Sequence, residues 1–84
     1  MKISELYRQI KEKSNEKGIN LYKSNGYLSA KKIADSTNGH DIEALIAGMN
    51  ESIQTSKGTK GDEMADALGA FIAYYEAYEK ELGK

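Results

Sequence analysis

One histidine and two carboxylates form the first run of residues that could do chemistry. His40-Asp41-x-Glu43 places three potential metal ligands or proton carriers side by side. A metal centre needs three or four convergent ligands with supporting hydrogen bonds, and a nucleophilic triad would need this histidine beside a serine and a carboxylate. No motif supports either arrangement. We interpret the run as a charge cluster at a helix start, and we expect no enzymatic activity, no metal and no cofactor.

A second run mixes glycine and lysine ahead of a helix, as phosphate-binding loops do. The run is SKGTKGDE, which includes Lys57 and Lys60. The spacing G-x-x-x-x-G-K-[ST] of nucleotide-binding loops is absent. The carboxylates of Asp62 and Glu63 would also meet any phosphate at that helix start. We therefore interpret the run as a linker.

Tyrosines make up six of the seven aromatic residues, and three of them lie in the run YYEAYEKE. Successive residues of a helix are rotated by about 100°, so these three cannot all face a core. Tyr75 fits the apolar stripe, whereas Tyr74 and Tyr78 share an edge row with Asp66 and Ala70. Tyrosines at such an edge either complete the rim of a core or contact a partner, because a large ring with one polar tip suits protein interfaces.

The segment from Asp62 to about Leu82 is predicted to be the longest helix. Its middle, MADALGAFIAYY, is apolar almost all round, which is typical of a helix buried on more than one side. One row carries only small residues at four-residue spacing, which lets another helix approach closely. We expect this helix to be the centre of a bundle or the interface of a homodimer. The predicted protein-interface residues are Ala65, Gly69, Ala73, Ala77, Tyr74 and Tyr78.

Two shorter helices are predicted near the start of the chain. The first begins with Ser4 as its N-cap and ends before Gly18, and the second is capped by Ser29 and ends in DSTNG. Between them, residues 21–28 form either a short hairpin around Asn25-Gly26 or a turn-rich loop. We favour the loop, because an isolated two-stranded ribbon is marginally stable.

A further helix is predicted to begin near His40 or Asp41, with a one-sided apolar stripe that faces the core. The stripe consists of Ile42, Leu45, Ile46, Met49 and Ile53. Gly48 weakens a helix by roughly 1 kcal/mol relative to alanine, which indicates close packing at that position. The exposed face is expected to carry Asp41, Glu43, Asn50, Glu51 and Ser52, without a cation.

The run LSAKKIADSTNGHDIEALIAGM resembles the helix-turn-helix unit of DNA-binding proteins, including winged ones. It shares an Ile-Ala pair, a turn with glycine and a following helix with an aliphatic pair. The glycine comes one residue later than in the usual turn, and His40 stands where an apolar residue is usual. The resemblance implies a base-reading helix, but an acidic face would repel phosphates and release no counterions. Under this alternative the nucleic-acid contacts would be Lys31, Lys32, Lys57 and Lys60.

The composition bounds the remaining possibilities. The chain has 84 residues, a net charge of −1, one arginine and no cysteine or proline. These values predict a single helical domain over residues 1–84, in the cytoplasm, without a signal peptide or membrane span. We expect an all-α, small four-helix bundle with a central C-terminal helix, in which the second and third helices have a helix-turn-helix-like order. The expected function is a protein-binding or regulatory module that forms a homodimer, such as a phage or mobile-element regulator or inhibitor of a host protein. The alternative is a helix-turn-helix transcription regulator.

Overall fold

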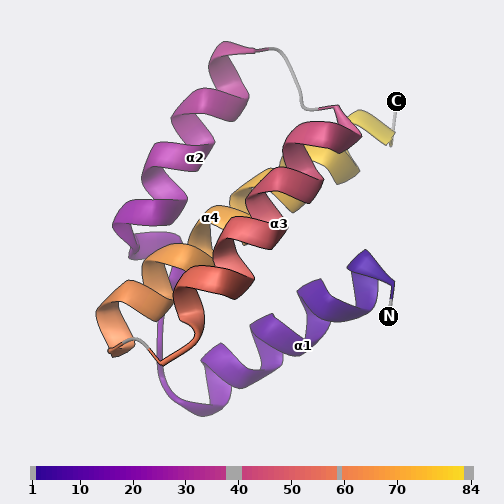
Figure 1. The fold of residues 1–84 in the computed structure, drawn as a ribbon. Helices are drawn as coiled ribbons and strands as arrows, with labels where there is room; N and C mark the ends of the chain where they lie inside the picture. Colours follow the sequence, from indigo (N-terminus) through magenta and orange to yellow (C-terminus); the bar gives the residue numbers. More distant parts are fainter. Residues whose placement is uncertain (1, 38–40, 59, 83–84) are drawn as a thin grey trace.

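The computed structural model describes residues 2–37, 41–58 and 60–82, and these form four α-helices and one 3₁₀ turn, with no strand among them. The helices are α1 (Ile3–Glu16), α2 (Asn25–Ser36), α3 (Ile42–Ser56) and α4 (Gly61–Leu82), and the turn η1 covers Leu21–Lys23. Figure 1 shows α4 running through the middle of the molecule, with α2 and α3 on either side of it. The all-α bundle with a central C-terminal helix is therefore confirmed.

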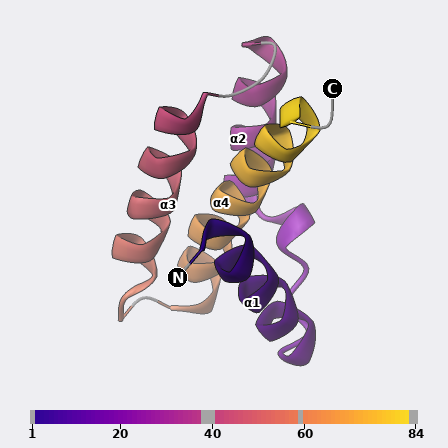
Figure 2. The same ribbon diagram turned by 90° about the vertical axis from the view of Figure 1, so that its right-hand side faces the viewer.

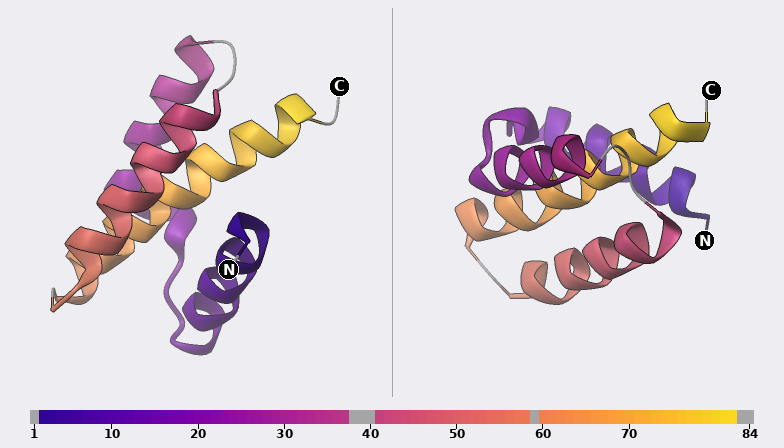
Figure 3. Two further views of the ribbon diagram at one scale, coloured as in Figure 1. Left: turned by 45° about the vertical axis from the view of Figure 1, so that its right-hand side comes forward. Right: turned by 90° about the horizontal axis from the view of Figure 1, so that it is seen from above.

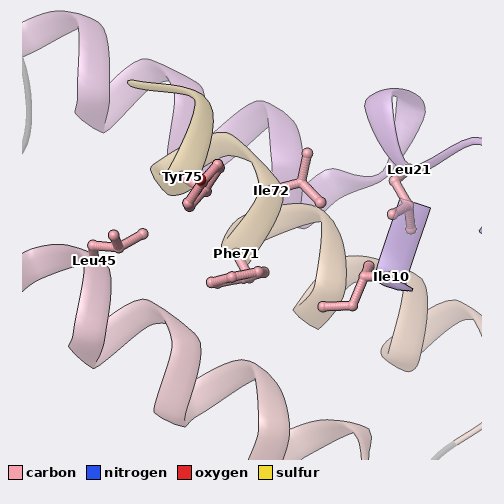
Figure 4. Packing of buried hydrophobic residues seen from close by; sticks show 6 residues of the cluster. All are labelled: Ile10, Leu21, Leu45, Phe71, Ile72 and Tyr75. Atoms are coloured by element: carbon pink, nitrogen blue, oxygen red, sulfur yellow. The ribbon is translucent and has the colours of Figure 1, made fainter. Parts of the chain in front are cut away.

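The core lies where the middle of α4 meets the other elements. Phe71 and Ile72 of α4 and Leu45 of α3 are fully buried. Ile10 from α1 and Leu21 from η1 complete this cluster together with Tyr75 (Figure 4). α2 adds the buried Ala30 and Ala34. Because every other element packs on α4, the predicted burial of this helix on several sides is correct.

Glycines mark the places where helices approach α4 most closely. An added Cβ at Gly26 of α2 would overlap the backbone carbonyl of Asp66, and one at Gly69 of α4 would overlap the hydroxyl oxygen of Ser24. At Gly48 of α3 an added Cβ would lie 2.5 Å from Cδ2 of Tyr74. The close packing that the sequence indicated at Gly48 is thus confirmed, since only glycine leaves room for this ring.

The Asn25-Gly26 pair does not form a hairpin turn but begins α2, five residues ahead of the predicted start. Ser24 is the N-cap, and its hydroxyl accepts a hydrogen bond from the backbone N–H of Tyr27 (3.1 Å). The carboxylate of Asp66 on α4 accepts from the N–H of Asn25 (2.9 Å) and Gly26 (3.4 Å). These acceptors satisfy the free amides at the helix start, so residues 21–28 hold a 3₁₀ turn and a helix start.

α1 begins at Ile3, and its N-cap is Lys2 rather than the predicted Ser4, two residues earlier; Lys2 gives no side-chain hydrogen bond. It ends as predicted at Gly18, which has a φ of 71°. The N–H of Gly18 donates to the carbonyl of Asn15, and the N–H of Ile19 donates to that of Ser14. This pair of bonds is a Schellman motif, which needs the left-handed conformation that glycine adopts without strain.

α3 is rotated from the predicted orientation. The side that packs on α4 carries Leu45, Gly48 and Ser52, and all three are buried. The hydroxyl of Ser52 donates to the carbonyl of Gly48 (2.8 Å) and also contacts the carbonyl of Ala67 on α4. The prediction that Ser52 is exposed is therefore wrong, and the prediction that the whole apolar stripe faces the core is also wrong.

Four members of the predicted stripe form a separate surface, which we call the α3 apolar stripe: Ile42, Ile46, Met49 and Ile53. The three isoleucines are 50%, 40% and 43% exposed, and Met49 is half-buried against the core. The rotation has a physical reason. Small residues let the α3 backbone approach the Tyr74 ring, whereas isoleucines at the same contact would hold the two helices apart.

α2 and α3 run in opposite directions along the two sides of α4, as the views in Figure 2 and Figure 3 show. Each packs on α4 rather than on its neighbour. The two helices of a helix-turn-helix unit cross at about 90–120° and pack together. The helix order of the resemblance is present, but the arrangement is an open helical hairpin around α4. No described helix is long and apolar enough to cross a membrane.

Candidate binding groove between α2 and α3

The space between α2 and α3 is an open groove of about 710 Å³ with α4 as its floor. Gly26, Ser29, Ala30 and Ile33 line it from α2. Gly48, Glu51, Ser52, Gln54 and Thr55 line it from α3. Glu63, Asp66, Ala67, Ala70 and Tyr74 line it from α4. The groove exists because α2 and α3 each contact α4 but hardly contact each other.

Small side chains make the middle of the groove deep enough for the backbone of another segment to come close. Ala67 and Ala70 line it from α4, and Ala30 of α2 and Gly48 of α3 line it from either side. Ile33 and Tyr74 are larger, and Ile33 is half-exposed. Apolar lining of this kind, with a few polar groups at the edge, is typical of sites that bind another molecule.

The charged groups among the described residues that line the groove are all acidic. Glu51 of α3 and Glu63 of α4 are exposed carboxylates at its edge, and Asp66 adds a third. Asp66 is already engaged, since its Oδ1 accepts the two backbone N–H groups at the start of α2. Among the described residues that line the groove, none is basic. The groove therefore presents a negative potential to whatever approaches it.

Most of the six predicted interface residues are packed within the bundle, and Tyr74 lines the groove. Gly69 and Ala73 are buried, and Ala65 and Ala77 are half-buried. The row is a close-packing surface as predicted, but η1 and the start of α2 of the same chain fill it at Gly69. A homodimer through this row would require that segment to leave α4.

The two predicted edge tyrosines are both half-buried, whereas Tyr75 is buried. Tyr74 lines the groove in one row with Asp66 and Ala70, as the helical spacing predicted. Tyr78 packs beside Tyr75, with ring centroids 6.4 Å apart. Of the six, Tyr74 is thus the residue that the structure places at the candidate site.

The lysines named for nucleic-acid contact are all exposed and lie outside the groove lining. Lys31 and Lys32 are on α2, whereas Lys57 is the C-cap of α3 and Lys60 directly precedes α4. The structure therefore does not gather the four around α3.

The charge cluster at the start of α3 is only partly described. Asp41 is the N-cap of α3 and accepts from the N–H of Ala44 (2.8 Å), while His40 lies outside the described residues. Across the described chain, no three acidic side chains stand close enough together to hold a metal ion.

A second polar cluster, which sequence reasoning missed, joins α1 to the rest of the chain. Its acceptor is the half-buried carboxylate of Glu76 on α4. The hydroxyl groups of Tyr7 (3.0 Å), Tyr22 (2.9 Å) and Tyr27 (3.5 Å) donate to its two oxygens. Lys11 completes this tyrosine–glutamate cluster, with its Nζ 3.4 Å from the hydroxyl of Tyr7.

The rings of the cluster pack as well as donate. Tyr7 stacks on Tyr75 with centroids 4.5 Å apart, and Tyr22 meets Tyr27 edge-on at 5.0 Å. Burial, aided by the charge of Glu76, raises the pKa of Tyr7 to about 12 and also raises the pKa of Tyr27. The hydroxyls of Tyr7 and Tyr27 therefore stay protonated and keep donating at neutral pH. The cluster positions α1 against α4.

Comparison with known protein families, curated proteins and solved structures gives no match. The function must be inferred from the groove and its neighbours. Of the residues that line the groove, the sequence singled out Tyr74 and its row. It could not show that Glu63 and Glu51, which lie on different helices, border one surface, because that depends on how α3 packs against α4.

Proposed function

We propose that the protein is a small protein-binding module, which takes a cationic amphipathic helical segment of a partner protein into the α2–α3 groove. It would regulate or inhibit that partner by occupying its surface. The observation that carries this proposal is the combination of a small-residue apolar floor with an edge whose described charges are all acidic. We place its action in the cytoplasm, since a chain without cysteine has no need of an oxidising compartment.

The size of the groove supports a helical occupant. A helix is about 10 Å across and rises 1.5 Å per residue, so a half-embedded helix of about three turns has a volume close to that of the groove. The flanking α2 and α3 have 12 and 15 residues, which gives walls of matching length. Ala67 and Ala70 let the incoming backbone come near, and Glu51 and Glu63 stand where lysines or arginines on its outer face would pass.

The experiment uses a synthetic helical peptide with leucine and alanine on one face and lysine on the other, labelled with one tryptophan. The protein has no tryptophan, so peptide fluorescence reports binding directly. We expect saturable binding that weakens as salt rises, because the paired charges are exposed. The same peptide with glutamate in place of lysine should not bind.

A pair of charge-matched variants tests the place of binding. The double variant Glu51→Lys with Glu63→Lys should bind the lysine peptide at least about tenfold more weakly, which corresponds to about 1.4 kcal/mol. Glu5→Lys with Glu12→Lys changes the net charge equally on exposed positions of α1, and it should leave binding within about twofold. Equal losses in both pairs would show that only the overall charge matters, and would refute the groove.

A duplex DNA binding assay distinguishes the helix-turn-helix alternative from our proposal. A DNA-binding protein should retain duplex DNA at about 50 mM salt and release it steeply as salt rises. Retention that is lost on changing Lys31 and Lys32 to alanine, together with no binding of the lysine peptide, would replace our proposal by that alternative.

A further inference from the structure

The α3 apolar stripe is a surface that the described chain leaves open. Ile42, Ile46 and Ile53 each keep two-fifths to one-half of their surface exposed, and Met49 lies between them at the edge of the core. A helical wheel places all four within an arc of about 60°. Such an ordered row differs from scattered exposed apolar residues, which are normal on a protein surface.

The stripe and the groove lie on opposite flanks of α3. Leu45, Gly48 and Ser52 face α4, and the stripe is rotated by about 100° from them. Glu51 and Thr55, which line the groove, lie on the other side of that contact. A molecule on the stripe would therefore leave the groove accessible.

The spacing of the stripe is suited to pairing with itself. Its members are separated by four, three and four residues, which is the spacing of a coiled-coil seam. This order is the same from either end. Two copies of α3 placed antiparallel would therefore set Ile42 against Ile53 and Ile46 against Met49, so that a two-fold axis uses every apolar residue.

The charges beside the stripe favour the antiparallel direction. Glu43 and Lys57 lie on the same flank of the stripe, at opposite ends of α3, and both are exposed. In an antiparallel pair Glu43 of one copy points towards Lys57 of the other, and the helix dipoles oppose each other. In a parallel pair Glu43 and Lys57 would lie at opposite ends and on opposite sides of the seam, so they could not meet.

We infer that α3 binds α3 of a second copy of this chain, antiparallel, through Ile42, Ile46, Met49 and Ile53. The homodimer thus uses α3 and not the small-residue row of α4, which the chain fills by itself at Gly69. The pair is a small interface, so it forms as a weak dimer at high protein concentration.

Analytical ultracentrifugation of the full chain, from about 1 µM to about 1 mM, tests the association. We expect a monomer–dimer equilibrium, which Ile46→Asp weakens by at least about 100-fold because it puts a charge at the centre of the seam. Leu28→Asp is the matched control, since Leu28 is 51% exposed on α2, away from the stripe. It should leave the equilibrium unchanged. Circular dichroism verifies that both variants fold, as neither side chain is buried. A wild-type monomer at about 1 mM, or a dimer that Ile46→Asp leaves intact, would overturn the inference.

Cysteine cross-linking tests the direction, because the chain has no cysteine of its own. Ile42→Cys mixed with Ile53→Cys should give a disulfide-linked heterodimer, since the two positions face each other. Each variant alone should stay uncross-linked, because its two copies of the cysteine lie about 16 Å apart along the seam. Efficient cross-linking of Ile42→Cys with itself would mean a parallel pair and would refute the proposed arrangement.

Discussion

Gly69 gives the sharpest test of how α2 is held against α4. A methyl group at this position would overlap the hydroxyl oxygen of Ser24 and would lie 3.1 Å from the carbonyl oxygen of Leu21 and 3.2 Å from Cβ of Tyr27. The Ser24 hydroxyl has two tasks, as it accepts from the N–H of Tyr27 and donates to the carbonyl of Leu21 (2.6 Å). The substitution Gly69→Ala therefore pushes against the N-cap of α2 as well as against its backbone.

The expected cost can be worked out from these contacts. Overfilling a packed contact costs about 1–3 kcal/mol, and displacing the Ser24 cap costs about 1 kcal/mol. Replacing glycine by alanine inside a helix returns about 1 kcal/mol. We expect Gly69→Ala to lower the free energy of unfolding by about 1–3 kcal/mol, although alanine is the better helix former. For a domain of this size, the melting temperature should fall by about 5–20 °C.

Urea unfolding followed by circular dichroism measures this difference, with Gly61→Ala as the control in the same helix. Gly61 has open space around its added Cβ, so alanine there should leave stability equal or slightly higher. The double variant Ser24→Ala with Gly69→Ala should cost less than the sum of the single changes by at least about 0.5 kcal/mol. Additive costs, or a Gly69→Ala protein as stable as the wild type, would refute the proposed contact.

Three further predictions concern α1, the tyrosines and α4. Folding raises the pKa of Tyr7 to about 12 and also raises the pKa of Tyr27. The folded state therefore keeps protons that the unfolded state releases, and the free energy of unfolding should fall as pH rises from about 10 to 12. A free energy of unfolding that stays constant over this range would contradict the cluster. Glu76→Gln should speed amide hydrogen exchange in α1 and leave exchange in α3 unchanged. The exposed control Glu81→Gln should affect neither helix. Equal exchange of α1 in the wild type and both variants would show that the cluster does not hold α1. Tyr75→Ala should destabilise the protein by about 3–5 kcal/mol and clearly more than Tyr74→Ala, since Tyr75 is buried and Tyr74 half-buried; the reverse order in urea unfolding would mean that α4 is rotated.

The sequence predicts most of the helices because their signals are local. Gly18 ends α1 through its own backbone conformation, and the apolar run around Phe71 makes α4 central whatever surrounds it. The start of α2 is not a local property. Asn25-Gly26 has the composition of a tight turn, and it becomes helical because Ser24 and the distant Asp66 supply acceptors for its N–H groups. Ser24 lies within residues 19–28 and is a local N-cap signal, but the acceptor on Asp66 lies outside them, so this segment alone does not decide between a tight turn and a helix start.

The candidate site was harder to predict for the same reason. The groove depends on the distance between α2 and α3, which is set mainly by the extensive contacts of each helix with α4. The tyrosine–glutamate cluster draws its hydroxyls from Tyr7, Tyr22 and Tyr27, which lie on three different elements. Periodicity identifies which residues share a face of one helix, but it cannot show which faces of different helices meet.

The orientation of α3 has an energetic consequence. A fully buried isoleucine stabilises a fold by about 1.5–3 kcal/mol. Three isoleucines that remain about half-exposed therefore forgo about 3 kcal/mol of hydrophobic stabilisation, which is a large part of the stability of a small domain. The close contact of α3 with α4, in which Gly48 meets the Tyr74 ring and Ser52 meets the Ala67 carbonyl, offsets this loss. Pairing two copies through the stripe would recover about 6 kcal/mol, whereas association costs at least about 4 kcal/mol. The difference is small, so the self-association of α3 should depend strongly on concentration, and one charged residue in the stripe should abolish it.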